Sequence, residues 1–223
     1  ILAVGSALAI VLGFILAAMV ERERFGEGVF RTIFLYPLAV SLIVTGLAWR
    51  WMLNPALGIE GFLKSHGFPD ASFNILASPD TAMYGVILAS IWHGMGFYMA
   101  LMLAGLKSIN PEIWSAARLD GIRLWRLYTE IIIPMMKFTF LTCAILLSLG
   151  VVKAYDIVVA MTNGGPGTST WTPAYFAINA YSTRSNIGFA SSAAVIMLVI
   201  TLVIFLPLVL ITAWQAKRQE ARV

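Results

Sequence analysis

The stretch Glu112-Ile-Trp-Ser-Ala-Ala-Arg-Leu-Asp120-Gly121 decides the fold, because it is polar and separates two long apolar runs, 81–106 and 135–161. Asn110-Pro111 just before it offers a cap and a first-turn proline, which predicts that a helix begins there. Gly121 then lets the chain turn before a second amphipathic piece begins. We therefore expect a folded segment built to contact a partner, in place of the short turn that ordinarily connects two membrane helices.

The composition of the chain places this segment in a membrane protein. Hydrophobic residues make up 60% and charged residues 12% of the 223 residues, and the mean hydropathy is +0.86. Soluble domains are only about half apolar. Five runs can each cross a ~30 Å hydrocarbon core, namely 1–20, 32–53, 81–106, 135–161 and 189–214. A buried soluble helix explains one such run but not five, so we expect one all-α integral membrane domain over 1–223.

The basic residues predict how this domain is oriented. Most of the 15 basic residues fall in alternate connections and in the tail, namely Arg22, Arg24, Arg31, Lys107, Arg118, Arg123, Arg126, Lys137, Lys217, Arg218 and Arg222. By the positive-inside rule these parts face the cytoplasm, and 54–80 and 162–188 face outward. A multi-pass protein of a bacterial or archaeal cytoplasmic (inner) membrane is expected. This bias accounts for the net charge of +4, and no nucleic-acid partner is expected beside the lipid.

The residue types that carry catalysis are sparse. The one cysteine, Cys143, lies in an apolar run, and His66 and His93 fall in different compartments. No cluster has metal-ligand spacing, and no phosphate-binding Gly-x-x-x-x-Gly-Lys occurs. We therefore expect no enzymatic activity, no metal and no cofactor in this chain. If the chain serves an energy-consuming process, the nucleotide must bind to another subunit.

Two interpretations of the segment 107–134 remain from its composition: an amphipathic helix lying on lipid headgroups, or a coupling helix that docks on a cytosolic partner. The spacing favours docking. Ser115-Ala116-Ala117, three residues, Gly121, nine residues, Ile131, one residue and Ile133-Pro134 resemble the signature loop of ABC-importer permeases. That loop reads Glu-Ala-Ala, three residues, Gly, nine residues, Ile-x-Leu-Pro. Asp120-Gly121 matches its carbohydrate branch, whereas Ser115 replaces a glutamate that could cap or form a salt bridge.

A second motif supports the same family. Met161-Thr-Asn-Gly-Gly-Pro-Gly167 resembles the outward turn of maltose- and glycerol-3-phosphate-type permeases, and the resemblance covers nearly the whole chain. It implies a six-helix core of which five helices are visible here, with a further helix upstream of Ile1. The coupling residues it implies are Ser115, Ala116, Ala117, Asp120, Gly121 and Pro134.

The resemblance also implies the partners and the solute. The chain would form half of the path of a binding-protein-dependent sugar importer, together with a second homologous permease. Two cytosolic ATPase subunits would hold ATP and Mg, and an extracytoplasmic solute-binding protein would deliver the sugar. The run from Lys153 to Gly167 looks most like permeases for glucose and α-glucosides. A polyol, amino-acid or phosphate-ester permease remains an alternative, as does a channel or structural subunit, although no ring of polar residues predicts a channel.

Polar groups within the apolar runs mark the expected solute path, since such groups are costly in lipid. The expected path residues are His93, Gly94, Phe97, Ser148, Gly150, Val151, Lys153 and Tyr155. In the family that this chain resembles, certain positions face the sugar. An ungapped count back from Pro134 places those positions at His93, Gly94 and Phe97. The same count on the next helix gives Leu147, Gly150, Val151 and Ala154, which lack the polar groups of the family. Packing of His93 between helices, and extension of Lys153 to the outer interface, remain the alternatives.

Overall fold

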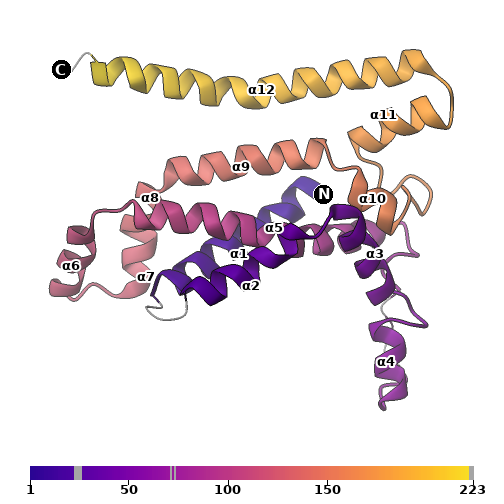
Figure 1. Cartoon of the computed structure of the whole chain (residues 1–223), viewed down its shortest axis with the longest axis horizontal. Coiled ribbons are helices and arrows are strands. Elements are labelled where there is room, and N and C mark those ends of the chain that lie inside the picture. Colours follow the sequence, from indigo (N-terminus) through magenta and orange to yellow (C-terminus); the bar gives the residue numbers. More distant parts are fainter. Residues whose placement is uncertain (23–26, 71, 73, 221–223) are drawn as a thin grey trace.

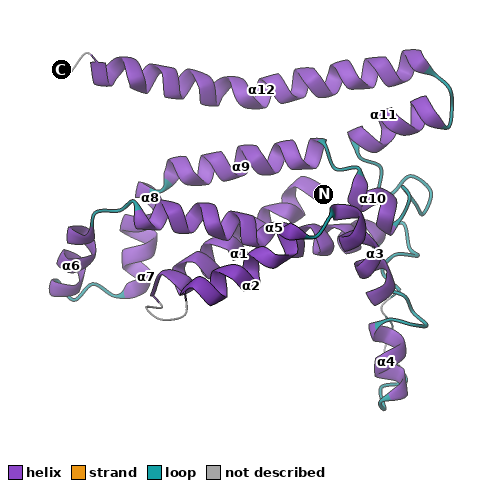
Figure 2. Cartoon of the chain, in the orientation of Figure 1, coloured by secondary structure: helices purple, strands orange, loops and turns teal. Residues whose placement is uncertain are grey.

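The structure is a computed structural model that describes the backbone of residues 1–22, 27–70, 72 and 74–220, and the side chains of all these except 22 and 207–220. Within these residues it is entirely helical, without a strand (Figure 2). The helices are α1 (Leu2–Arg22), α2 (Glu27–Ala39), α3 (Leu42–Met52), α4 (Ile59–Ser65), α5 (Ala82–Lys107), α6 (Pro111–Leu119), α7 (Leu124–Arg126), η1 (Leu127–Ile132, a π-helical stretch), α8 (Ile133–Met135), α9 (Lys137–Val152), α10 (Asp156–Met161), α11 (Pro173–Ser182) and α12 (Ile187–Glu220).

The helix α5 forms the centre of the bundle, with α1, α2 and α9 packed along it (Figure 1). Met99 and Met102 of α5 are fully buried, together with Cys143 of α9. The contact between α5 and α2 is so close that a Cβ atom at Gly96 would collide with the Phe34 carbonyl. A side chain at this position would therefore push the two helices apart.

Among the described residues, length and composition allow α1, α5 and α12 to cross a membrane singly, and the number of possible spans rises to five if each of two bent helix pairs is one span. The first pair corrects the expected single helix 32–53. There α2 and α3 meet at 94°, with Pro37 inside α2 and the Ser41 hydroxyl accepting a hydrogen bond from the Val44 amide at 3.3 Å. A proline removes a helical hydrogen bond and a serine cap starts a new helix, so these residues break the span.

The expected single helix 135–161 is also wrong. Residues Leu124–Met135 and Lys137–Val152 meet at 71°, and a second break separates α9 from α10. At that break the Ala154 carbonyl accepts a hydrogen bond from Thr172 Oγ1, and the Ala154 amide bonds back to Val151 at 3.2 Å. These hydrogen bonds accompany the end of α9 at Val152, with Lys153 as its cap, before α10 begins.

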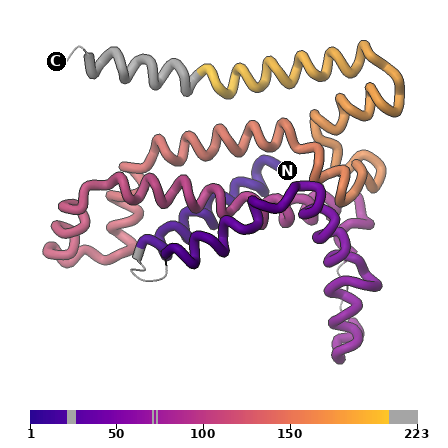
Figure 3. The backbone as a smooth tube through the Cα atoms, viewed as in Figure 1, coloured from indigo at the N-terminus to yellow at the C-terminus, as the bar shows by residue number. Residues whose placement is uncertain are grey.

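The connections between the long helices lie at two opposite ends of the bundle, and the basic segment 107–134 lies at a different end from the described residues of 54–80 and 162–188 (Figure 1). The segment from α6 to α8 lies at one end of the bundle, whereas α3, α4, α10 and α11 lie at the other (Figure 1). An ion pair between Lys107 and Glu27 joins α5 to α2 at the α6 end. The backbone tube shows the chain passing back and forth between these ends (Figure 3). Arg24 and Arg222 lie outside the described residues, and the side chains of Arg22, Lys217 and Arg218 are not described.

Candidate functional site

A cavity of about 290 Å³ opens between α1, α5, α9 and the junction of α9 with α10. Its size is near the lower end of ligand pockets, roughly 300–1,000 Å³. The polar residues that line it are Ser6, Ser90, His93, Tyr98, Lys153, Tyr155 and Asp156. Aliphatic side chains such as Leu147 and Val151 form the rest of the wall. Apolar walls with a few hydrogen-bonding groups suit a small solute that is itself amphipathic.

Six of the eight expected path residues line this cavity, namely His93, Gly94, Gly150, Val151, Lys153 and Tyr155. Phe97 does not. Its ring packs edge-on against Tyr98 at a centroid distance of 5.5 Å and joins the apolar core. Ser148 also lies outside the lining, and its hydroxyl donates to the Ala144 carbonyl at 2.8 Å. Whether the six lining residues contact a solute remains a prediction.

Sequence reasoning missed Ser6, Ser90, Tyr98 and Asp156 as lining residues. Ser90, Gly94 and Tyr98 follow one another at intervals of four, so they share one face of α5. Phe97 lies one residue away from Tyr98, about 100° around a helix with 3.6 residues per turn. The interval of four from Gly94 was therefore the signal that could have identified Tyr98.

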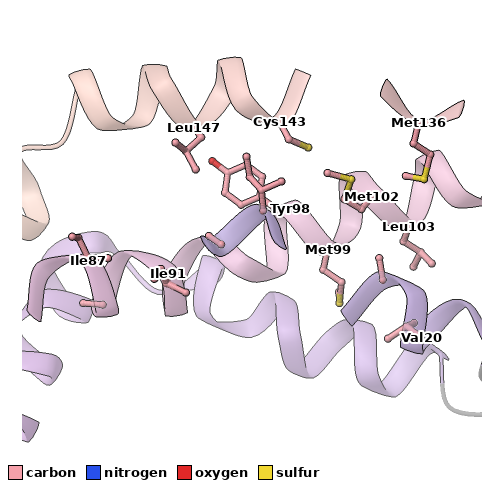
Figure 4. Packing of buried hydrophobic residues seen from close by; sticks show 14 of the residues in the cluster. Val20, Ile87, Ile91, Tyr98, Met99, Met102, Leu103, Met136, Cys143 and Leu147 are labelled. Atoms are coloured by element: carbon pink, nitrogen blue, oxygen red, sulfur yellow. The ribbon is translucent and has the colours of Figure 1, made fainter. Parts of the chain in front are cut away.

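The Tyr98 side chain extends from α5 toward α9, near Leu147 and Cys143 (Figure 4). Tyr98 is buried from the outer surface and lines the cavity, and its hydroxyl makes no hydrogen bond to another described residue. A buried phenol ordinarily finds a partner. The hydroxyl is thus available to a solute or water in the cavity.

His93 is held on one side by α3, because its Nδ1 lies 3.5 Å from the hydroxyl of the buried Thr45. This long contact fixes the ring weakly, and the residue also lines the cavity. Lys153 and Asp156 do not form an ion pair in the described part of the chain. Lys153 caps the end of α9 and Asp156 begins α10.

The segment 107–134 folds as the sequence predicts at the start of its helix and at its glycine turn. The Asn110 side chain accepts a hydrogen bond from the Glu112 amide at 2.9 Å, and Pro111 occupies the first turn of α6. At the other end Gly121 has φ +63°, which disfavours any residue with a Cβ. The Ile122 amide bonds back to Ala117 at 3.0 Å and closes the helix end.

The helix α6 has one packed and one exposed face. Ala117 is buried, and the Trp114 ring meets Tyr128 at a centroid distance of 5.9 Å. Ser115 and Ala116 of α6 are exposed, as are Asp120 and Gly121 directly after it, and Pro134, which belongs to α8, is exposed as well. The Ser115 hydroxyl donates to the Pro111 carbonyl at 3.1 Å, so it is already engaged within the helix.

Exposed apolar side chains accompany this polar face. Leu119 is 88% and Trp125 59% exposed, and Leu124 lies between them in sequence. The Arg126 guanidinium lies 5.5 Å from the Trp125 ring centre and 3.7 Å from the Glu130 carboxylate. Large apolar groups exposed together on a folded segment are typical of an interaction site.

The turn after α10 is held by its own hydrogen bonds. The hydroxyls of Thr162 and Thr170 lie 2.7 Å apart, and Thr170 donates to the Gly165 carbonyl at 3.0 Å. The Tyr175 hydroxyl donates to the Asn163 carbonyl at 2.6 Å. The Thr-x-Gly-Gly-Pro motif is therefore an ordered connection between α10 and α11. In the part of the chain described here, no group of three His, Cys, Asp or Glu could hold a metal ion.

The described residues form an all-helical bundle with long apolar helices, bent helix pairs, a polar-lined cavity and an exposed amphipathic helix, α6, at one end. These features define the class of multi-pass membrane proteins. Residues 9–223 match the family described as binding-protein-dependent transport system inner membrane component. The chain belongs to this family.

Three relatives of this chain are ABC transporter or transport system permeases. The chain is 34% identical over 212 residues to a Probable ABC transporter permease protein of Pyrococcus horikoshii, covering 95% of this chain and 72% of the relative. It is 29% identical over 199 residues to the trehalose/maltose transport system permease protein MalF of Thermococcus litoralis, covering 89% and 67%. It is 30% identical over 214 residues to the sn-glycerol-3-phosphate permease protein UgpA of Agrobacterium fabrum, covering 95% and 70%.

A solved structure shares the fold. The crystal structure of a bacterial alginate ABC transporter, in complex with a periplasmic protein bound to alginate pentasaccharide, contains a similar chain. The TM-score is 0.78 at 20% identity, with 92% of this chain and 73% of that chain covered. At this identity the likeness shows the arrangement of helices alone.

Proposed function

We propose that this chain is one transmembrane subunit of an ATP-driven carbohydrate importer. The observation that carries the proposal is the exposed, folded helix α6 with its Gly121 turn, presented at one end of a bundle whose centre holds a polar-lined cavity. The family match and the sugar permeases among the relatives support it. The cavity would form part of the path, and α6 would receive the movement of a cytosolic ATPase.

The partners follow from this role. A second, related permease would complete the path, and an extracytoplasmic solute-binding protein would deliver the solute. Two ATPase subunits would bind ATP and Mg on the cytoplasmic side of a bacterial or archaeal inner membrane. Permease movement would then open the path alternately to the two sides, since ATP-driven closure of the ATPases displaces a helix docked on them.

The solute is proposed to be glucose or an α-glucoside. Tyr98 and Tyr155 offer aromatic rings for the apolar faces of a sugar, and His93 and Ser90 offer hydrogen-bonding groups for its hydroxyls. Uptake of radiolabelled glucose, maltose and trehalose into proteoliposomes, driven by ATP and the cognate binding protein, tests this choice. Import of none of the three, with import of a polyol or amino acid instead, would contradict it.

A phosphate ester such as glycerol 3-phosphate is a second candidate, because Lys153 places a cation in the cavity wall. Asp156 lines the same wall and opposes that cation. Inclusion of sn-glycerol 3-phosphate in the same uptake assay decides between the two. The sugar proposal requires that this ester neither enters nor competes.

Docking through α6 is tested with a charge reversal. Asp120→Lys leaves the helix intact, since a cation at a helix C-terminus is favourable, but it reverses the charge presented to the ATPase. We expect the variant to insert normally and to lose both transport and co-purification of the ATPase subunit. Asp120→Asn is the matched control. Normal uptake by Asp120→Lys would remove this helix from the coupling contact.

A further inference from the structure

A second hollow lies away from the cavity, at the bundle end opposite α6. It is a groove of about 590 Å³ between α11 and the first turns of α12. Trp171 and Phe176 line one side, and Phe189, Ile196 and Ile200 line the other. Phe189 and Ile196 are exposed along with most of the described part of α12, so the groove opens on the apolar face of a helix that is long and apolar enough to cross a membrane.

The hydroxyl groups in the groove are turned toward the protein backbone. Thr172 Oγ1 donates to the Ala154 carbonyl and accepts from the Tyr175 amide at 3.2 Å. Ser192 Oγ donates to the Gly188 carbonyl at 2.7 Å. A sugar would therefore find few free hydrogen-bonding groups here, whereas a hydrocarbon chain needs none. The lining selects an apolar occupant.

A positive charge lies at one edge of this apolar groove. The Arg184 guanidinium stands 5.4 Å from the ring centre of Trp171, which itself lines the groove. Arg184 is exposed and forms no ion pair with any described carboxylate. The ring holds the guanidinium by a cation–π contact and leaves its donors available. A guanidinium binds the two oxygens of a phosphate in parallel.

We propose that this groove binds one acyl chain of an anionic phospholipid, with the lipid phosphate against Arg184. Apolar lining and a cation at the edge are the two requirements of such a ligand, and they meet at Trp171. A zwitterionic lipid fits less well, because its own cation would lie near the guanidinium. The proposal rests on the membrane location of the chain and not on which solute is transported.

Lipid binding is tested on the complete transporter, purified in detergent and stripped of native lipid. Native mass spectrometry measures retention of phosphatidylglycerol and of phosphatidylcholine with the same palmitoyl and oleoyl chains. We expect preferential retention of phosphatidylglycerol by the wild type. Equal retention of the two lipids would overturn the proposed selection by charge.

Three variants locate the site. Arg184→Gln should weaken phosphatidylglycerol binding about tenfold, as expected for one lost charge-assisted contact, and Arg184→Lys should restore part of it. Ala193→Trp, which fills the groove from α12, should lower retention of both lipids. Arg50→Gln, an exposed basic residue at the same end of the bundle, is the matched control and should bind as the wild type does.

Two outcomes would contradict the proposed lipid site. Wild-type lipid retention by Arg184→Gln or by Ala193→Trp would show that the lipid lies elsewhere. The groove could instead hold a protein helix. A photoreactive group at Ser192 that cross-links to the second permease, and not to lipid, in the reconstituted transporter would assign the groove to the subunit interface and end the lipid proposal.

Discussion

At the scale of the residue, Tyr98 is the side chain with which the solute cavity can be tested most directly. Tyr98→Phe keeps the ring in place and removes a hydroxyl that has no partner in the described chain. A lost hydrogen bond to an uncharged ligand costs about 0.5–1.5 kcal/mol, so we expect the maximal rate of uptake to fall about two- to tenfold. ATP-driven uptake into proteoliposomes with saturating binding protein measures this rate.

Phe97→Leu is the matched control, since the Phe97 ring lies outside the cavity and packs in the core. It should lower stability slightly and leave the rate near that of the wild type. A larger transport defect in Phe97→Leu than in Tyr98→Phe would show that the path runs along a different face of α5. The sequence alone favoured Phe97, because it lies one turn from His93.

The residues of the cavity could be predicted only in part, for a physical reason. Polar groups in an apolar run, such as His93 and Lys153, stand out because lipid does not solvate them. The sequence does not reveal which face of α5 lines the cavity, because this helix is apolar on nearly all sides. Without a polar stripe, the choice between Phe97 and Tyr98 depends on contacts with α1 and α9 that a sequence does not reveal.

At the scale of the element, the broken helices separate what could be predicted from what could not. The five apolar runs indicated the helices, but each long run was expected to be continuous. Lys153 followed by Asp156 was the overlooked signal, since a cation suits the end of one helix and an anion the start of the next. Pro37 and Ser41 were a similar signal between α2 and α3. Hydropathy averages over such residues and therefore conceals the breaks.

The junction of α9 with α10 should depend on Thr172. Thr172→Val keeps the shape of the side chain and leaves the Ala154 carbonyl without its hydroxyl donor. A fully buried acceptor left unsatisfied costs about 1–3 kcal/mol; because Ala154 is only half-buried, we expect a modest lowering of the midpoint of thermal unfolding in detergent. Thr183→Val, at an exposed position beyond α11, is the control. Equal midpoints for the two variants would show that the hydroxyl does not hold the break.

The turn after α6 should tolerate alanine better than proline. Gly121 has φ +63° and donates to the Arg118 carbonyl at 3.2 Å. Alanine at this φ costs about 1–2 kcal/mol, whereas proline requires φ near −65° and has no amide hydrogen. We expect Gly121→Ala to transport at a reduced rate and Gly121→Pro to insert but not to transport. Equal uptake by both variants would show that transport does not depend on the backbone conformation of this turn.

At the scale of the whole molecule, the end of the bundle that carries α6 should face the cytoplasm. Single cysteines are introduced at exposed Ser65, Thr168 and Arg126 in a Cys143→Ala background, Cys143 being buried. An impermeant maleimide should label the first two in intact cells and the third only after permeabilisation, because basic connections stay inside. Labelling of all three in denatured protein controls for expression. Reaction at Arg126→Cys from outside would reverse the orientation, and α6 could then not meet a cytosolic ATPase.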